Sequence, residues 1–158
     1  MSTADLPGAG KRGWPQLLAL VVGVVFLLIG IVGFFITGFG DFFGNDNAGH
    51  TAHMDTLLGF MINPMHNLVH VVIGAAGIAL SRPLSGARTY GVLLLAGYGA
   101  AFVYGLIAID KDWDFLNLNW ADNVLHLLTA LVGLVIALGK VKGVTTERGA
   151  DHSLRTGR

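Results

Sequence analysis

The sequence predicts an all-α membrane protein, a polytopic four-helix bundle made of two tandem helical hairpins. Charged residues make up 13% of the chain and hydrophobic residues 53%, whereas soluble domains carry about 25% charged residues. Four stretches have almost no charge and approach or exceed the roughly 20 apolar residues that a helix needs to cross a bilayer. A polar pattern near the start of the second stretch also recurs 56 residues later, in the fourth. These observations favour a duplicated membrane-spanning helix pair.

The uncharged stretches define the bounds of the expected elements. They run from Gln16 to Thr37, from Asn63 to Leu80, between Arg88 and Asp110, and from Trp120 to Leu138. We therefore expect a flexible N-terminal segment (1–13), a membrane domain (14–139) and a flexible C-terminal segment (140–158), because both end segments lack apolar periodicity. Segments 54–62 and 111–118 mix acids with large apolar residues, so we expect short amphipathic turns there.

The basic residues predict the orientation. Nine of the ten Lys and Arg residues precede the first span, lie between the second and third, or follow the fourth, and only Lys111 lies on the other side. Lys and Arg concentrate in cytoplasmic loops. We therefore expect a multi-pass protein of the plasma membrane with both termini cytoplasmic. The net charge of zero removes any electrostatic case for nucleic-acid binding.

The repeated pattern is the most informative motif. Residues 63–70 read NPMHNLVH and residues 119–126 read NWADNVLH, and three polar residues coincide: Asn63 with Asn119, Asn67 with Asn123, and His70 with His126. Both halves run in the same direction, so we expect a parallel repeat about an axis along the membrane normal.

The same pattern predicts where two helices begin. Asparagine favours the N-cap and proline the first helical position, so Asn63 and Asn119 should cap the second and fourth spans. Asp122 would then occupy the third helical position, where the helix dipole favours a carboxylate.

Residues of the repeat at i, i+4 and i+7 share one helical face. Small residues extend this polar face along each span: Gly74 and Gly77, and Ala130 and Gly133. Because small residues let helix backbones approach closely, we expect spans two and four to meet in the bundle interior.

Two i,i+4 pairs within the repeat form a candidate metal site. His66 with His70, and Asp122 with His126, would supply three imidazoles and one carboxylate. Such ligands suit zinc, manganese, iron or copper. The favoured alternative is that these groups hydrogen-bond to one another between the helices. Two others stay open: haem b held by His70 and His126, and ion passage along the polar face.

The N-x-x-H-N-x-x-H run (63–70), its D-N-x-x-H counterpart (122–126) and the opening span LLALVVGVVFLLIGIVGF (17–34) resemble those of an uncharacterised family. Its members are small four-span actinobacterial membrane proteins with a domain of unknown function. The resemblance covers residues 13–138. It implies the four-span architecture and no particular activity.

Two classes of function follow from the sequence. One is a non-catalytic membrane protein, an accessory or structural subunit whose apolar faces contact the bilayer, a partner membrane protein or a second copy of the chain. The other is a bundle that binds a metal ion or haem, or conducts ions, through the polar cluster. The sequence contains no evident nucleophile, base and orienting group, so we do not expect hydrolysis.

Overall fold

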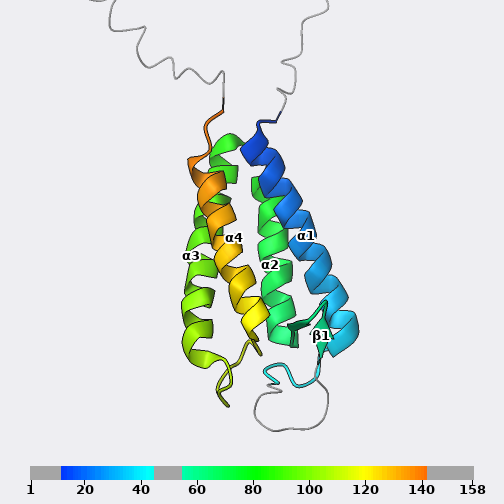
Figure 1. Cartoon of the computed structure of the whole chain (residues 1–158). Helices are drawn as coiled ribbons and strands as arrows, with labels where there is room; N and C mark the ends of the chain where they lie inside the picture. The colour runs from blue at the N-terminus through cyan, green and yellow to red at the C-terminus, as the bar shows by residue number, and fades with distance from the viewer. Residues whose placement is uncertain (1–11, 45–54, 142–158) are drawn as a thin grey trace, which may run out of the picture.

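The computed structural model of the protein describes residues 12–44 and 55–141, and both expected flexible ends lie largely outside these residues. The described part forms a bundle of four helices (Figure 1). They are α1 (Trp14–Thr37), α2 (Pro64–Leu80), α3 (Leu84–Ala108) and α4 (Trp120–Leu138). By length and composition α1, α3 and α4 can cross a membrane, whereas α2 is apolar but has only 17 residues.

The predicted starts of α2 and α4 are confirmed. The Asn63 side chain accepts a hydrogen bond from the backbone N–H of His66 at 2.8 Å, and Asn119 accepts one from Asp122 at 3.0 Å. Asp122 occupies the third helical position, and its carboxylate accepts a hydrogen bond from the backbone N–H of Asn119. Each asparagine therefore satisfies an N–H group that would otherwise have no partner in the helix.

Helix α3 begins earlier than predicted, at Leu84 rather than after Arg88. Pro83 is the N-cap residue, so the connection from α2 is only three residues long. Arg88 lies inside the helix and its guanidinium donates a hydrogen bond to the backbone carbonyl of Gly139 at 3.3 Å. Arg88 ends the uncharged stretch but not the helix, because its long side chain extends to the polar carbonyl group of Gly139.

Segment 54–62, predicted as a short turn, contains two short strands within an otherwise helical fold. Strand β1 (Thr56–Leu57) pairs antiparallel with β2 (Phe60–Met61), with Thr56 opposite Met61. Leu58 and Gly59 form the turn with positive φ angles of 55° and 88°. Two central residues with positive φ match the right-handed twist of the paired strands, so a β hairpin forms.

The closest backbone contacts lie within each helical hairpin. A Cβ atom at Gly74 would lie 2.3 Å from the backbone nitrogen of Leu27, and one at Gly133 would lie 2.6 Å from the carbonyl oxygen of Gly91. The expectation that these small residues join the second and fourth spans is therefore wrong. No Cα atom of α2 lies within 8 Å of a Cα atom of α4, both helices being fully described.

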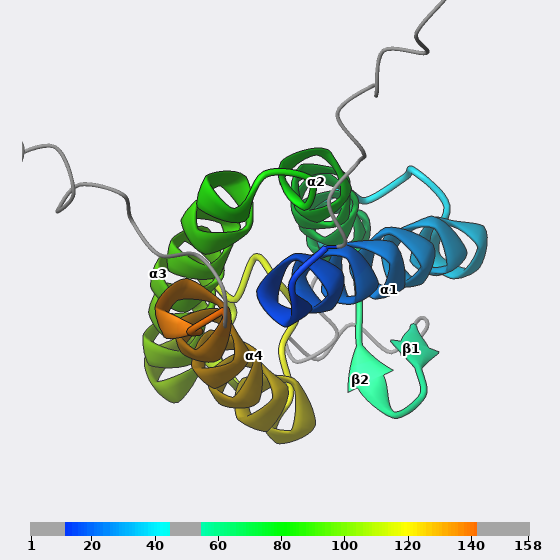
Figure 2. The same ribbon diagram turned by 90° about the horizontal axis from the view of Figure 1, so that it is seen from above.

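The two helical hairpins face each other through larger side chains. Seen from above, α1 and α2 form one side of the bundle and α3 and α4 the other (Figure 2). Phe26 of α1 and Tyr90, Leu94 and Tyr98 of α3 are buried in the same apolar core. Small residues thus join the helices of each hairpin, and bulky residues fill the space between the hairpins.

We predict that Gly74→Ala destabilises the bundle, because its methyl group would collide with the α1 backbone, at a cost of about 1–3 kcal/mol. Thermal unfolding of the purified protein in detergent would show a lower midpoint. Gly99→Ala is the matched control, since no described atom beyond its own helical turns lies within 4 Å of that Cβ position. Equal midpoints for the two variants would contradict the packing of α1 on α2.

Candidate functional site

The polar residues predicted as a site gather at the end of the bundle that carries the β hairpin. Seven of them are buried and Asn119 is half-buried. The seven are Asn63, His66, Asn67, His70, Asp122, Asn123 and His126, each with at most 6% of its surface exposed. His66, His70, Asp122 and His126 are therefore all buried inside the protein.

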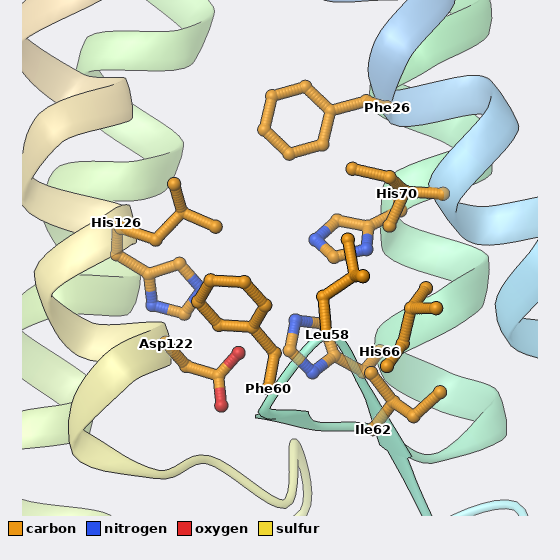
Figure 3. A pocket seen from close by; sticks show the side chains of 11 residues that line it. Phe26, Leu58, Phe60, Ile62, His66, His70, Asp122 and His126 are labelled. Carbon is orange, nitrogen blue, oxygen red and sulfur yellow. The ribbon is translucent and has the colours of Figure 1, made fainter.

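His66, His70 and His126 form the histidine cluster, which bridges the two helical hairpins (Figure 3). The ring centroid of His66 lies 4.5 Å from that of His70 on the same helix and 6.0 Å from that of His126 on α4. Phe26 packs against His70 at 5.2 Å, and Tyr98 packs against His126 at 5.4 Å. Side chains of α2 and α4 thus meet although their backbones do not.

The hydrogen-bonded network predicted between these histidines does not form at their Nδ1 atoms. Among the described residues, Nδ1 of His66, His70 and His126 is buried and has no hydrogen-bond partner. The ring of His66 makes hydrogen-bonding contacts with the backbone of Met61 and Leu116. The ring of His126 makes a hydrogen-bonding contact with the backbone of Ala101.

The asparagines of the motif point into their own helical hairpins. Asn67 of α2 lies against Gly33 of α1 and donates a hydrogen bond to the Thr37 hydroxyl at 3.0 Å. Asn123 of α4 lies against Gly105 of α3, and neither of its amide atoms has a partner within residues 12–44 and 55–141. The polar face of each helix is therefore divided, with asparagine toward the partner helix and histidine toward the other hairpin.

Asp122 connects α4 to the β hairpin. Its Oδ2 atom accepts hydrogen bonds from the backbone N–H of Met61 at 3.1 Å and of Asn119 at 3.0 Å. In the close-up its carboxylate lies beside the histidine cluster (Figure 3). Asp122 therefore caps a helix, holds the β hairpin and borders the cluster.

The capping asparagines also join the two halves of the chain. The Asn63 amide donates a hydrogen bond to the carbonyl of Phe115, in the loop before α4, at 2.8 Å. The Asn119 amide donates one to the carbonyl of Gly59, in the turn of the β hairpin, at 2.9 Å. Each cap thus contacts the loop of the opposite half.

Two small cavities border the histidine cluster, and all three histidines line both of them. One has about 50 Å³ of room for the centres of water-sized molecules and is also lined by Phe26, Phe60 and Leu125. The other has about 110 Å³ and is lined by Val69, Tyr98 and Leu116, among others. Ligand pockets for drug-sized molecules measure about 300–1,000 Å³, so haem does not fit either space as it stands.

The four predicted metal ligands are neighbours but do not form a finished coordination site. In the described part of the chain, no three His, Asp or Glu side chains are placed so that one ion could bind them all. Metal binding by His66, His70, Asp122 and His126 stays a prediction.

Tyr98 is a member of the site that the sequence analysis missed. Its hydroxyl is buried and has no hydrogen-bond partner among the residues that the structure describes. A lone tyrosine in an apolar span gives no signal by itself. However, Phe26 and Tyr98 are 72 residues apart and pack on equivalent histidines, so alignment of α1 with α3 could have identified the position.

Asp114 organises the loop that covers one side of the site. Its carboxylate accepts hydrogen bonds from the backbone N–H of Leu118 at 2.7 Å, from that of Leu116 at 3.2 Å, and from the Tyr104 hydroxyl at 3.1 Å. Burial raises the pKa of this carboxyl above its ordinary value, and the hydrogen bonds oppose that shift. Because Leu116 lines the larger cavity, Asp114 positions part of its wall.

Comparison with known proteins identifies a family. The family model described as domain of unknown function DUF4383 matches residues 16–139. This confirms the resemblance to an uncharacterised family, and the actinobacterial origin stays a prediction. No curated protein and no solved structure matches the chain.

We predict that Asp114→Ala loosens the loop before α4, because it removes the acceptor of the buried Leu118 N–H and of the half-buried Leu116 N–H, at a cost of about 1–3 kcal/mol. Hydrogen exchange measured by mass spectrometry should be faster in residues 109–119. Asp112→Ala, an exposed neighbour, is the control and should leave the exchange unchanged. Unaltered exchange in Asp114→Ala would show that the carboxylate does not hold the loop.

Proposed function

We propose that this chain, which belongs to the DUF4383 family, is a four-span plasma-membrane protein that binds a polar ligand between its two helical hairpins. Three helices are long and apolar enough to cross a membrane. Helix α2 packs along α1 through glycines and connects to α3 by three residues. Helix α2 is short and apolar, and in that position it can serve as the remaining membrane span. Its N-terminal end, capped by Asn63, would then lie near the membrane–water interface.

Both termini lie in the cytoplasm in this proposal. The basic residues at the ends of the bundle support it, because Arg12, Arg82, Arg88 and Lys140 belong to the end opposite the β hairpin. Lys and Arg mark the cytoplasmic side. The β hairpin and the loop before α4 then face outward, and the histidine cluster lies in the outer half of the bilayer.

The unpartnered Nδ1 atoms of the histidine cluster are the observation that carries ligand binding. A polar group buried without a hydrogen bond costs about 1–3 kcal/mol in proteins, and membrane interiors offer no water as a substitute. All three histidines have such an atom, and all three also line two small spaces with room for water-sized molecules. A ligand that bonds to them would remove this cost. An accessory subunit without a ligand would retain it.

The two halves of the membrane domain form a parallel repeat in this proposal. Equivalent contacts support it: Phe26 packs on His70 as Tyr98 packs on His126. Asn67 lies against Gly33 as Asn123 lies against Gly105. A repeat of this kind brings the two histidines to equal depth and creates a ligand site at the junction of the halves.

We predict that single cysteines at Asp112 and Arg82 label from opposite sides of intact cells. Both side chains are exposed, and the chain has no cysteine of its own, so the background is low. A membrane-impermeant maleimide should modify Asp112→Cys from outside and Arg82→Cys only after lysis. Modification of both from outside would contradict the topology.

We also predict the sign of a stability change. If nothing binds there, replacing His70 and His126 together by Leu removes two buried Nδ1 atoms that have no partner among the described residues, and we expect the replacement to be neutral or stabilising. If a ligand occupies the cluster, the same replacement loses the ligand's contribution to stability. We expect a lower unfolding midpoint for protein purified directly from membranes.

The control for this double variant keeps the same helices and changes only exposed positions. Val72 of α2 and Val124 of α4 are both exposed, so Val72→Leu combined with Val124→Leu should leave the midpoint unchanged. A higher midpoint for the histidine double variant would favour an accessory role without a ligand.

A further inference from the structure

We infer that the end of the bundle opposite the β hairpin is a docking surface for the phosphate groups of anionic phospholipids. This surface, which we call the basic end, consists of Arg12, Arg82, Arg88 and Lys140. The inference rests on the proposed function only for the membrane topology, since the histidine cluster lies at the other end.

The charges of the described residues are separated between the two ends of the bundle. Four of the five described Lys and Arg residues belong to the basic end. The acidic residues of the described part lie at the end with the β hairpin (Figure 1), and they are Asp41, Asp55, Asp110, Asp112, Asp114 and Asp122. Within residues 12–44 and 55–141, the basic end therefore carries positive charge without a carboxylate to balance it.

Contacts between helices bring three of the basic residues together. The Trp14 indole N–H, at the start of α1, donates a hydrogen bond to the carbonyl of Lys140 at 3.0 Å. The Arg88 guanidinium of α3 donates one to the carbonyl of the adjacent Gly139 at 3.3 Å. Arg12 precedes Trp14 by two residues, and the start of α1 lies beside the end of α4 (Figure 2). Arg12, Arg88 and Lys140 therefore gather around the end of α4.

Arg82 joins the same end through the connection between α2 and α3. The Gln16 side chain of α1 donates a hydrogen bond to the carbonyl of Arg82 and accepts one from the backbone N–H of Gly13 at 2.8 Å. A single side chain thus links the residue that follows Arg12 to Arg82. The four basic residues are held at one end by hydrogen bonds that connect different helices.

The basic side chains are accessible to a ligand. All four residues are exposed. In the part of the chain that the structure describes, the side chains of Arg12, Arg82 and Lys140 have no hydrogen bond or ion pair. Arg88 donates one hydrogen bond, and a guanidinium has five N–H donors. Like charges gathered in this way repel one another, so an anion at this end would be stabilising.

Trp14 indicates the depth of the basic end in the membrane. This residue is exposed and begins α1. Tryptophan is enriched at membrane–water interfaces, where its ring lies at the level of the lipid headgroups. Because its indole contacts the backbone of Lys140, the basic end lies at the same level. Its neighbours in a membrane are therefore phosphate groups rather than acyl chains.

The residue types favour a phosphate ligand with uncompensated charge. Three of the four residues are arginine, whose guanidinium can bind two phosphate oxygens through parallel N–H groups. Basic pockets on the cytoplasmic side of membrane helices bind anionic headgroups. Phosphatidylglycerol carries one net negative charge, whereas the ammonium group of phosphatidylcholine cancels the charge of its phosphate. We therefore expect the basic end to prefer phosphatidylglycerol.

The test is a titration of the full-length protein in detergent with phosphatidylglycerol or phosphatidylcholine of the same acyl chains. Native mass spectrometry counts the bound lipids. We expect phosphatidylglycerol to bind more tightly to the wild type. Arg82→Gln and Lys140→Gln should each weaken its binding roughly fivefold, the contribution of one basic residue near an anionic lipid surface. Binding of phosphatidylcholine should not change.

The matched control is Lys111→Gln, which removes one positive charge at the other end of the bundle and should keep the preference. Arg82→Lys retains the charge and should restore most of the affinity that Arg82→Gln loses. Circular dichroism checks that each variant is folded. Equal binding of the two lipids by the wild type would overturn the docking surface. An effect of Lys111→Gln as large as that of Arg82→Gln, or full affinity in the Arg82→Gln, Lys140→Gln double variant, would also overturn it.

Inorganic phosphate separates a lipid surface from a site for a free anion. At constant ionic strength, we expect inorganic phosphate to leave phosphatidylglycerol bound. Displacement would assign the basic end to a soluble phosphate compound, and the lipid proposal would be wrong.

The docking surface and the proposed function can fail separately. If cysteine labelling agrees with the topology and the protein shows no lipid preference, only the docking surface is wrong. If labelling contradicts the topology and the preference holds in detergent, the docking surface stands and the proposed orientation is wrong. Neither result depends on the stability of the His70→Leu, His126→Leu double variant, which tests the ligand of the histidine cluster.

Discussion

Close contact between helix backbones at glycine residues is the constraint on which the rest of this structure depends. At Gly74 and Gly133 the neighbouring helix leaves no room for a methyl group, so α1 pairs with α2, and α3 with α4, backbone against backbone. In each pair the small residues lie at the contact between the two helices of that pair. The faces they turn toward the other pair carry histidine and aromatic side chains, which keep α2 and α4 apart. The space around the histidine cluster is a consequence of that division.

The two tight pairs are then joined at one end by polar contacts. Asn63 and Asn119 each accept a hydrogen bond from their own helix and donate another to a loop of the opposite half. An asparagine amide has both an acceptor and donors, so a single residue can cap a helix and connect two halves. Each cap fixes the start of its helix, so His70 and His126 both lie about two turns after their capping asparagine.

The chemistry of the site follows from this arrangement. The protein satisfies Asp122 through backbone N–H groups and leaves one nitrogen on each of the three histidines without a partner among the described residues. Buried polar atoms without a partner are costly in a membrane interior, where no water can replace the missing partner. The β hairpin and the Asp114 loop cover the same region, so the parts of the chain least suited to a membrane interior are gathered over the site.

The sequence by itself determined the features that depend on near neighbours. The caps at Asn63 and Asn119, the third-position Asp122 and the apolar helices follow from residues within one or two turns, as does the burial of polar residues inside an apolar span. Tertiary structure decided which way each face turns. From the sequence, Gly74 and Gly133 could have formed a contact between α2 and α4. The rotation of each helix about its own axis instead turns Gly74 toward α1 and Gly133 toward α3. The same rotation brings Tyr98 to His126 and leaves the Nδ1 atoms unpaired. Such rotation is set by the packing of residues far apart in the chain, and no local pattern encodes it.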